Sequence, residues 1–157
     1  MQGKHSKDSY TEQVHILMPE HINGAGRLFG GRLLAWVDVV AAIVARRHSE
    51  HDVTTVSIDH LTFLAPAHEN DTIVLTGKIT WVGHTSMEVR VDTYIETLHV
   101  QRQRVNRAYL VMVAIDEQEK PCAVPSLILD DEEERTAWIA AERRNLDRRA
   151  RRQEEEA

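Results

Sequence analysis

The sequence predicts an α+β fold in which one long central helix is wrapped by a curved antiparallel sheet, with a charged helix at the C-terminal end. Residues 33–45 are apolar apart from Asp38, which is typical of a helix that is buried on every side. Residues 73–81 and 87–91 alternate apolar and polar side chains, with the period of a β-strand. From residue 130 onward the composition changes, because 17 of the last 28 residues are charged. Since a long twisted antiparallel sheet can curl around a single helix, these observations together predict the fold class.

One strand and one loop precede the helix. Residues 14–18 form a short apolar run that stops at Pro19, which predicts a first strand. Residues 20–29 contain several glycines and predict a loop. This loop leads directly into the glycine pair Gly30 and Gly31, where the helix is expected to begin.

The helix is expected to end near residues 46–48, whose positive charge suits the carbonyl end of a helix. Residues 53–64 are rich in β-branched side chains and predict the second strand. The alternation of this strand changes phase between Ile58 and Leu61, which predicts either a β-bulge or a change of the covering surface there.

Three further strands complete the expected sheet. Residues 73–81 and 87–92 are joined by residues 82–86 and predict a long hairpin. Residues 108–115 are continuously apolar, as in a central strand that is buried on both faces. Residues 116–121 then form a polar turn.

The chain is expected to hold one domain, residues 1–129, followed by a charged helical tail, residues 130–157. The tail has only a thin apolar stripe, so we expect a solvated helix that docks at its beginning and frays at its end.

Composition excludes several classes of function. The net charge is −6 and the pI is about 5.8, which argues against a nucleic-acid partner. No apolar run approaches the about 18 residues needed to span a membrane, and no apolar signal core is present at the N-terminal end. A single cysteine, Cys122, suits a reducing cytoplasm and excludes an internal disulfide. The nine histidines form no metal-ligand array, so we expect no metal.

Asp38 is the most informative residue for function, because a carboxylate in an apolar helix is costly unless it is paired, neutralised or used. On a helical wheel it lies about 140° from Leu33, on the face opposite the core stripe. Small and aliphatic neighbours on that face indicate that a second subunit covers it. Asp38 is therefore either a functional carboxylate or the partner of an arginine, such as Arg32 or Arg46, in a structural ion pair.

Spaced motifs in the chain resemble the hotdog-fold acyl-CoA thioesterases of the cytosolic acyl-CoA hydrolase type. Residues 23–38 resemble the family signature N-x-x-G-x-x-F-G-G-x6-D. The other matching segments are residues 62–66, 83–86 and 113–116, followed by Pro121 and by Val124 and Pro125. The resemblance spans about residues 10 to 126 and implies the hotdog fold. It also implies hydrolysis of acyl-CoA thioesters and a homo-oligomer, at least a dimer and further a trimer of dimers. Ala25 departs from the pattern, since many members have a second Asn there.

The resemblance implies roles for four residues near the helix start. Asp38 would act as general base on a water molecule, and direct nucleophilic attack is the alternative. The Gly31 amide would stabilise the oxyanion, while Gly30 would let the thioester approach the backbone. Asn23 would orient the water or thioester from the facing subunit. The structural alternatives are tight helix packing at the two glycines and an ordinary turn at Asn23.

The resemblance also implies contacts with the coenzyme A part of the substrate, and no separate cofactor. The expected contacts along the pantetheine arm are Gly83, Thr85 and Ser86, which would otherwise serve only the hairpin turn. The candidates for the nucleotide phosphates are Arg32, Arg104 and Arg107.

Two alternative functions follow from the same fold. A hotdog dehydratase acting on hydroxyacyl thioesters generally uses a histidine near the helix start, and no histidine lies between Asn23 and Arg47. A non-catalytic acyl-CoA sensor would use the same cavity only for binding. Such a sensor has no need for both Asn23 and Asp38, so the sequence favours the thioesterase.

Overall fold

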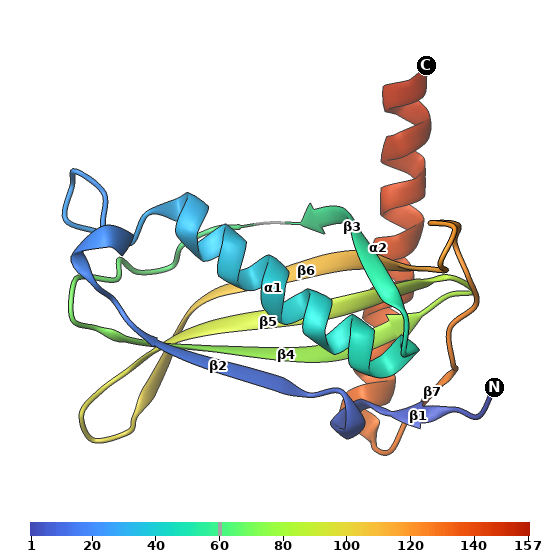
Figure 1. Ribbon diagram of the computed structural model, residues 1–157, viewed down its shortest axis with the longest axis horizontal. Coiled ribbons are helices and arrows are strands. Elements are labelled where there is room, and N and C mark those ends of the chain that lie inside the picture. The colour runs from blue at the N-terminus through green and yellow to red at the C-terminus, as the bar shows by residue number, and fades with distance from the viewer. Residues whose placement is uncertain (60) are drawn as a thin grey trace.

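The computed structural model describes residues 1–59 and 61–157 of the chain. Figure 1 shows a long helix lying along one face of a curved sheet, with a second long helix on the other face. The elements, in chain order, are β1 (Lys4–His5), η1 (Ser6–Asp8), β2 (Thr11–Ile16), η2 (Pro19–His21), α1 (Gly30–Ser49), β3 (Asp52–Asp59), β4 (Thr72–Val82), β5 (Ser86–Glu96), β6 (Arg102–Ile115), β7 (Leu127–Ile128) and α2 (Glu132–Glu156).

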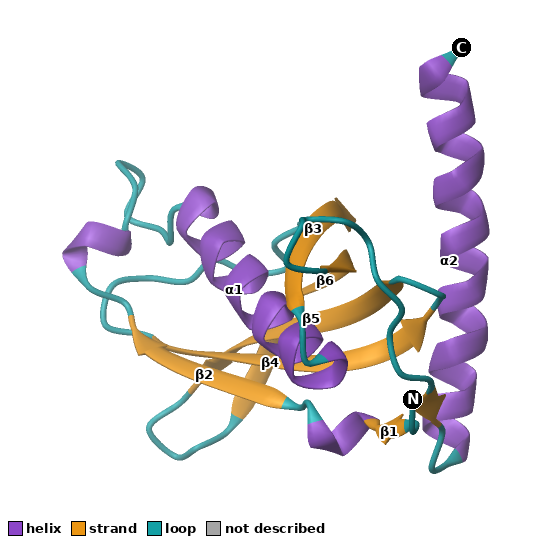
Figure 2. Ribbon diagram, turned by 45° about the vertical axis from the view of Figure 1, so that its right-hand side comes forward, coloured by secondary structure: helices purple, strands orange, loops and turns teal. Residues whose placement is uncertain are grey.

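Five strands form one antiparallel sheet in the order β2-β4-β5-β6-β3. The sheet curls around α1, with β2 and β3 at its two edges (Figure 2). At Gly77 on β4 the helix approaches so closely that an added Cβ would lie 2.7 Å from Val40 and 2.8 Å from Val44. This close approach explains a glycine in the middle of a buried strand. The prediction of a central helix wrapped by a curved antiparallel sheet is confirmed.

The core side of α1 is an apolar stripe at helical spacing whose five members are fully buried: Leu33, Val37, Val40, Ala41 and Val44. The opposite side is open in the single chain, where Leu34 is 38% and Val39 is 48% exposed. One sheet covers only one side of the helix, as expected, so burial of the other side stays a prediction that requires a second subunit.

The hairpin of β4 and β5 and the buried strand β6 are confirmed. The register of β3 against β6 shifts between Thr55 and Ser57. The predicted change of phase between Ile58 and Leu61 falls partly outside the described residues. Strand β3 also ends at Asp59, and residue 60 of the predicted strand lies outside the described residues. The short parallel pair of β1 and β7 was not predicted from the sequence.

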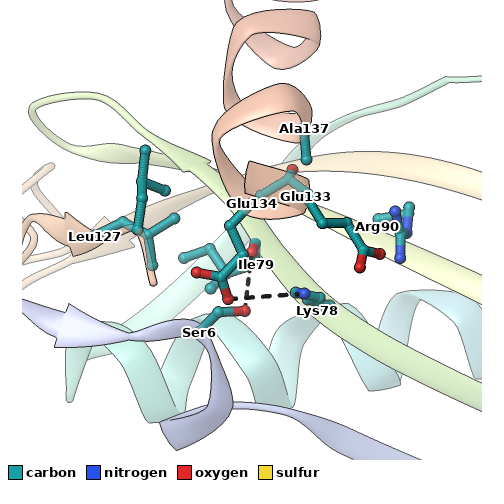
Figure 3. Close-up of a pocket in the computed structure, with 10 residues that line it drawn as sticks. Ser6, Lys78, Ile79, Arg90, Leu127, Glu133, Glu134 and Ala137 are labelled. Atoms are coloured by element: carbon teal, nitrogen blue, oxygen red, sulfur yellow. Dashed lines mark hydrogen bonds and ion pairs between the residues drawn. The ribbon is translucent and has the colours of Figure 1, made fainter. Parts of the chain in front are cut away.

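Helix α2 is docked more extensively than predicted. The Asp131 side chain caps its first turn by accepting a hydrogen bond from the Glu134 amide. In that turn Glu134 lies 3.8 Å from Lys78 on β4 (Figure 3). The helix remains packed far beyond this turn, since Ala141 and Arg148 are buried. The expected solvated helix that docks only at its beginning is thus wrong, because charged side chains of α2 meet charged partners on the sheet.

Neither helix in the described part of the chain is both long and apolar enough to cross a membrane. Among residues 1–59 and 61–157, no group of three or more histidine, cysteine or acidic side chains is placed to hold a metal ion.

Candidate active site

A pocket of about 360 Å³ lies beside the first turn of α1. Two segments far apart in the sequence form its walls. Its lining residues are Asn23, Arg27, Leu28, Gly30, Phe63, Leu64, Ala65, Pro66 and Ala67. The pocket therefore joins the glycine loop before α1 with the segment 62–66 that carried part of the family resemblance.

Backbone hydrogen bonds fix both walls of this pocket. The Leu28 amide donates to the Ala67 carbonyl at 2.8 Å and joins the walls directly. The Leu64 amide donates to the Val105 carbonyl at 2.8 Å, and Asn106 Nδ2 donates to the Thr62 carbonyl at 2.7 Å. The second wall is therefore held against strand β6.

Asn23 organises the first wall as a turn residue. Its Oδ1 accepts hydrogen bonds from the amides of Ala25 at 2.9 Å and Arg27 at 3.2 Å. Gly26, inside the same turn, has a φ of 76°, which favours glycine. Asn23 therefore does serve the turn, but only through the carbonyl oxygen of its side chain. Among the described residues its side-chain amide has no acceptor, so it is left for another partner.

The two glycines at the start of α1 have different surroundings. An added Cβ on Gly31 would lie 2.7 Å from the ring of Phe29, whereas one on Gly30 would meet only Phe63 at 3.9 Å. The amides of Arg32 and Leu33 already donate to the Phe29 carbonyl. Within the described part of the chain, the Gly31 amide has no acceptor. The helix start thus offers a free N–H donor at the positive end of the helix dipole.

Asp38 lies two turns further along α1, about 10 Å from Gly31 on the same face of the helix. It is half-buried, and its Oδ1 accepts a hydrogen bond from Thr55 Oγ1 at 2.6 Å. Among the described residues Asp38 makes no ion pair, and Arg46 lies instead 3.6 Å from Asp52. The alternative of a structural ion pair with Arg32 or Arg46 is therefore wrong.

Within one chain, the predicted contacts along the pantetheine arm lie away from this pocket. The turn that contains Gly83, Thr85 and Ser86 is at the other end of α1 (Figure 1). There the Val124 amide donates to the His84 carbonyl at 2.9 Å, and His48 at the end of α1 donates to the Pro125 carbonyl at 2.8 Å. A role for this turn in binding substrate stays a prediction that requires a neighbouring chain.

The three candidate arginines differ in how free they are. Arg32 and Arg104 are exposed, so their guanidinium groups are available. Arg107 binds Asp92 with two hydrogen bonds, at 2.6 Å and 3.1 Å. That pair raises the pKa of Arg107 and holds its side chain against the sheet. Its contact with a phosphate stays a prediction, and the phosphate would compete with Asp92 for the guanidinium group.

Thr55 is a site residue that was not predicted from the sequence. The residue lies in a β-branched strand, where threonine is common and carries no signal of its own. Its significance depends on the sheet placing it opposite Asp38, 17 positions earlier in the chain.

Comparison with known proteins agrees with this geometry. The family model described as the thioesterase superfamily matches residues 25–101. A protein of Bacillus subtilis named as an uncharacterized acyl-CoA thioester hydrolase is 34% identical over 152 residues, which are 96% of this chain and 88% of that protein. The chain belongs to the thioesterase superfamily. A solved apo-hexameric acyl-CoA thioesterase matches this thioesterase-superfamily chain with a TM-score of 0.91 and 36% identity, over 96% of this chain and 97% of that chain.

A Staphylococcus aureus acyl-CoA hydrolase offers a comparison for individual residues of this superfamily member. It was solved with butyryl coenzyme A, coenzyme A and coenzyme A disulfide, and matches with a TM-score of 0.92 and 31% identity, over 98% of this chain and 94% of that chain. Structures of that hydrolase also exist with alanine replacing one aspartate, one asparagine and one threonine. The three replaced residues have the same separations along that chain as Asp38, Asn23 and Thr55 have here.

Proposed function

We propose that this chain hydrolyses acyl-CoA thioesters to a free carboxylic acid and coenzyme A. The observation that carries the proposal is the arrangement along one face of α1. A free backbone donor lies at the helix start, and Asp38, oriented by Thr55, lies two turns further on. The names of the relatives support the same reaction, since the Bacillus subtilis and Staphylococcus aureus proteins are both named for acyl-CoA hydrolysis.

In the proposed mechanism, Asp38 accepts a proton from water as the water oxygen attacks the thioester carbonyl carbon. The carbonyl oxygen gains negative charge and accepts a hydrogen bond from the Gly31 amide. The carbon–sulfur bond then breaks, and the thiolate of coenzyme A takes up the proton. Thr55 occupies one oxygen of the Asp38 carboxylate, which leaves the other for water. The reaction needs only water as co-substrate, so no cofactor is proposed.

We propose that the active protein is a homo-oligomer, at least a dimer and further a trimer of dimers. The exposed Leu34 and Val39 flank Asp38 on the open side of α1, where a second copy would exclude bulk water. The hexameric neighbour supports this assembly. Sedimentation velocity over a dilution series, with activity measured at each concentration, tests it. Full activity of a monomer would contradict the proposal.

The deciding experiment follows release of the free thiol of coenzyme A from acyl-CoA substrates of different chain length. Steady release with each catalytic turnover is expected. Binding without release would indicate a sensor, and reversible hydration of an enoyl-CoA without thiol release would indicate a dehydratase.

Asn23 is proposed to orient water or the thioester through its side-chain amide. Replacing it by aspartate keeps the oxygen that accepts the turn hydrogen bonds and removes only the amide donor. We expect Asn23→Asp to lower kcat by about 10²-fold, the usual effect of losing one oriented donor, with little change in Tm. Asn23→Ala should lower both kcat and Tm. If Asn23→Asp retains wild-type kcat, the residue serves only the turn.

A further inference from the structure

A buried ion network joins helix α2 to the outer face of the sheet. Glu88 on β5 is fully buried, and its carboxylate accepts hydrogen bonds from Arg144, Arg148 and Thr80 at distances between 2.6 and 3.0 Å. Burial alone would raise the pKa of Glu88. The hydrogen bonds from Arg144, Thr80 and Arg148 outweigh burial and lower it, so the carboxylate is ionised.

Arg148 extends this network to the edge strand β3. Its Nη2 donates to Glu88 at 2.6 Å, and its Nε donates to Asp59 Oδ2 at 2.7 Å. The Arg148 side chain is only 7% exposed. Because β6 lies between β5 and β3, Arg148 links two strands that are not neighbours in the sheet. Asp59 is the last residue of β3, so the contact holds the end of a strand that has a neighbour on only one side.

The same edge strand carries Thr55 on its opposite face. Thr55 faces α1 and binds Asp38, whereas Asp59 faces α2 and binds Arg148. Two residues four positions apart would normally face the same side of a strand. The bulge between Thr55 and Ser57 reverses the phase and allows the strand to serve both helices.

We infer that Arg148 is a positioning residue for the reaction, which holds β3 from outside the sheet so that Thr55 stays in place against Asp38. The inference rests on the proposed function. Helix α2 lies outside the segment matched by the family model. The inferred role of Arg148 gives this helix a part in catalysis without contact with the substrate.

The alternative is that α2 only stabilises the fold, and Arg144 offers a matched control. Arg144 also binds the Glu88 carboxylate and stacks over the Tyr109 ring at 3.7 Å. Within the described residues it makes no hydrogen bond to β3. Replacing either arginine by methionine removes one cation from Glu88 and keeps most of the aliphatic stem. Only the replacement of Arg148 removes the hydrogen bond to Asp59, which then keeps a longer ion pair with the exposed Arg151 at 3.8 Å.

The experiment measures kcat and KM of the full-length protein for the Arg148→Met and Arg144→Met variants, alone and with Thr55→Val. We expect Arg148→Met to lower kcat about 10-fold with KM nearly unchanged, because small misplacements of catalytic groups reduce rates strongly. Arg144→Met should lower Tm by a similar amount and leave kcat near the wild-type value. In the Thr55→Val background, Arg148→Met should lower kcat no further, because its effect acts through Thr55.

Asp59→Asn provides a second variant if Arg148→Met does not fold, since it leaves both cations on Glu88 and weakens only the contact with β3. It should reproduce the loss of kcat. Equal losses for the two arginine variants, or a loss for Arg148→Met that persists in the Thr55→Val background, would overturn the inference. Failure of the proposed function is separately visible, because then the wild type would release no thiol or Thr55→Val alone would keep wild-type kcat.

Discussion

Replacement of Asp38 by asparagine is expected to lower kcat for acyl-CoA hydrolysis by about 10²- to 10⁴-fold, the usual contribution of a positioned general base. Asparagine has nearly the same shape and keeps an oxygen that can accept the hydrogen bond from Thr55. The fold should therefore be retained, and the loss should reflect proton transfer alone.

Asp52→Asn is the matched control for this prediction. Asp52 is also an acidic residue close to α1, but it is exposed and lies 3.6 Å from Arg46 on the surface. We expect its kcat to match the wild type. Steady-state kinetics, together with circular dichroism and thermal unfolding of both variants, make the comparison. If the Asp38→Asn and Asp52→Asn variants show the same kcat, Asp38 is not the base.

The parts of the fold that follow from local periodicity could be predicted from the sequence. The buried stripe of α1 repeats at the helical period, and the alternation in β4 and β5 reflects one face packed on that helix. Asp38 stood out for the same local reason, because it is one charge in an apolar run. These features each depend on neighbours within a few residues.

The features that could not be predicted depend on contacts between distant segments. The Thr55 hydroxyl is significant only because β3 returns along α1 to Asp38. The pocket forms only because Leu28 binds Ala67, 39 positions later. Glu88 is one of the polar residues in the alternating segment 87–91, and its burial depends on Arg144 and Arg148, 56 and 60 positions later. A charged helix looks solvated in sequence unless its partners on the sheet are known.

Sequence and structure together indicate why the two faces of β3 matter. The inner face supplies the hydrogen bond that orients the candidate base, and the outer face is held by α2. The buried carboxylate of Glu88 is the common partner of Arg144 and Arg148 on α2. Glu88 therefore contributes to the stability of the fold and, through Arg148, to the inferred positioning of the site.

Replacement of Glu88 by alanine is expected to lower the free energy of unfolding by about 3–5 kcal/mol, because it removes the carboxylate shared by the buried Arg148 and the half-buried Arg144. Arg144 would lose its only carboxylate among the described residues, and Arg148 would keep only Asp59. The control is Glu12→Ala, which breaks the surface pair with Arg102 at 2.9 Å and should cost less than about 1 kcal/mol. Urea unfolding at neutral pH measures both values. Equal losses for the two variants would show that the buried network adds no more stability than a surface pair.

The pH dependence of this effect follows from the lowered pKa of Glu88. A carboxyl group whose pKa is lower in the folded state stabilises the fold above its ordinary pKa of 4.5, and that stabilisation is lost as the pH falls through the folded value. Glu88→Gln keeps the shape of the side chain but cannot ionise. The difference in unfolding free energy between the wild type and Glu88→Gln should therefore be largest above pH 4.5 and should shrink on further acidification. A difference that stays constant as the pH is lowered to the acid-unfolding limit would mean that the carboxylate is not held in its charged form by Arg144 and Arg148.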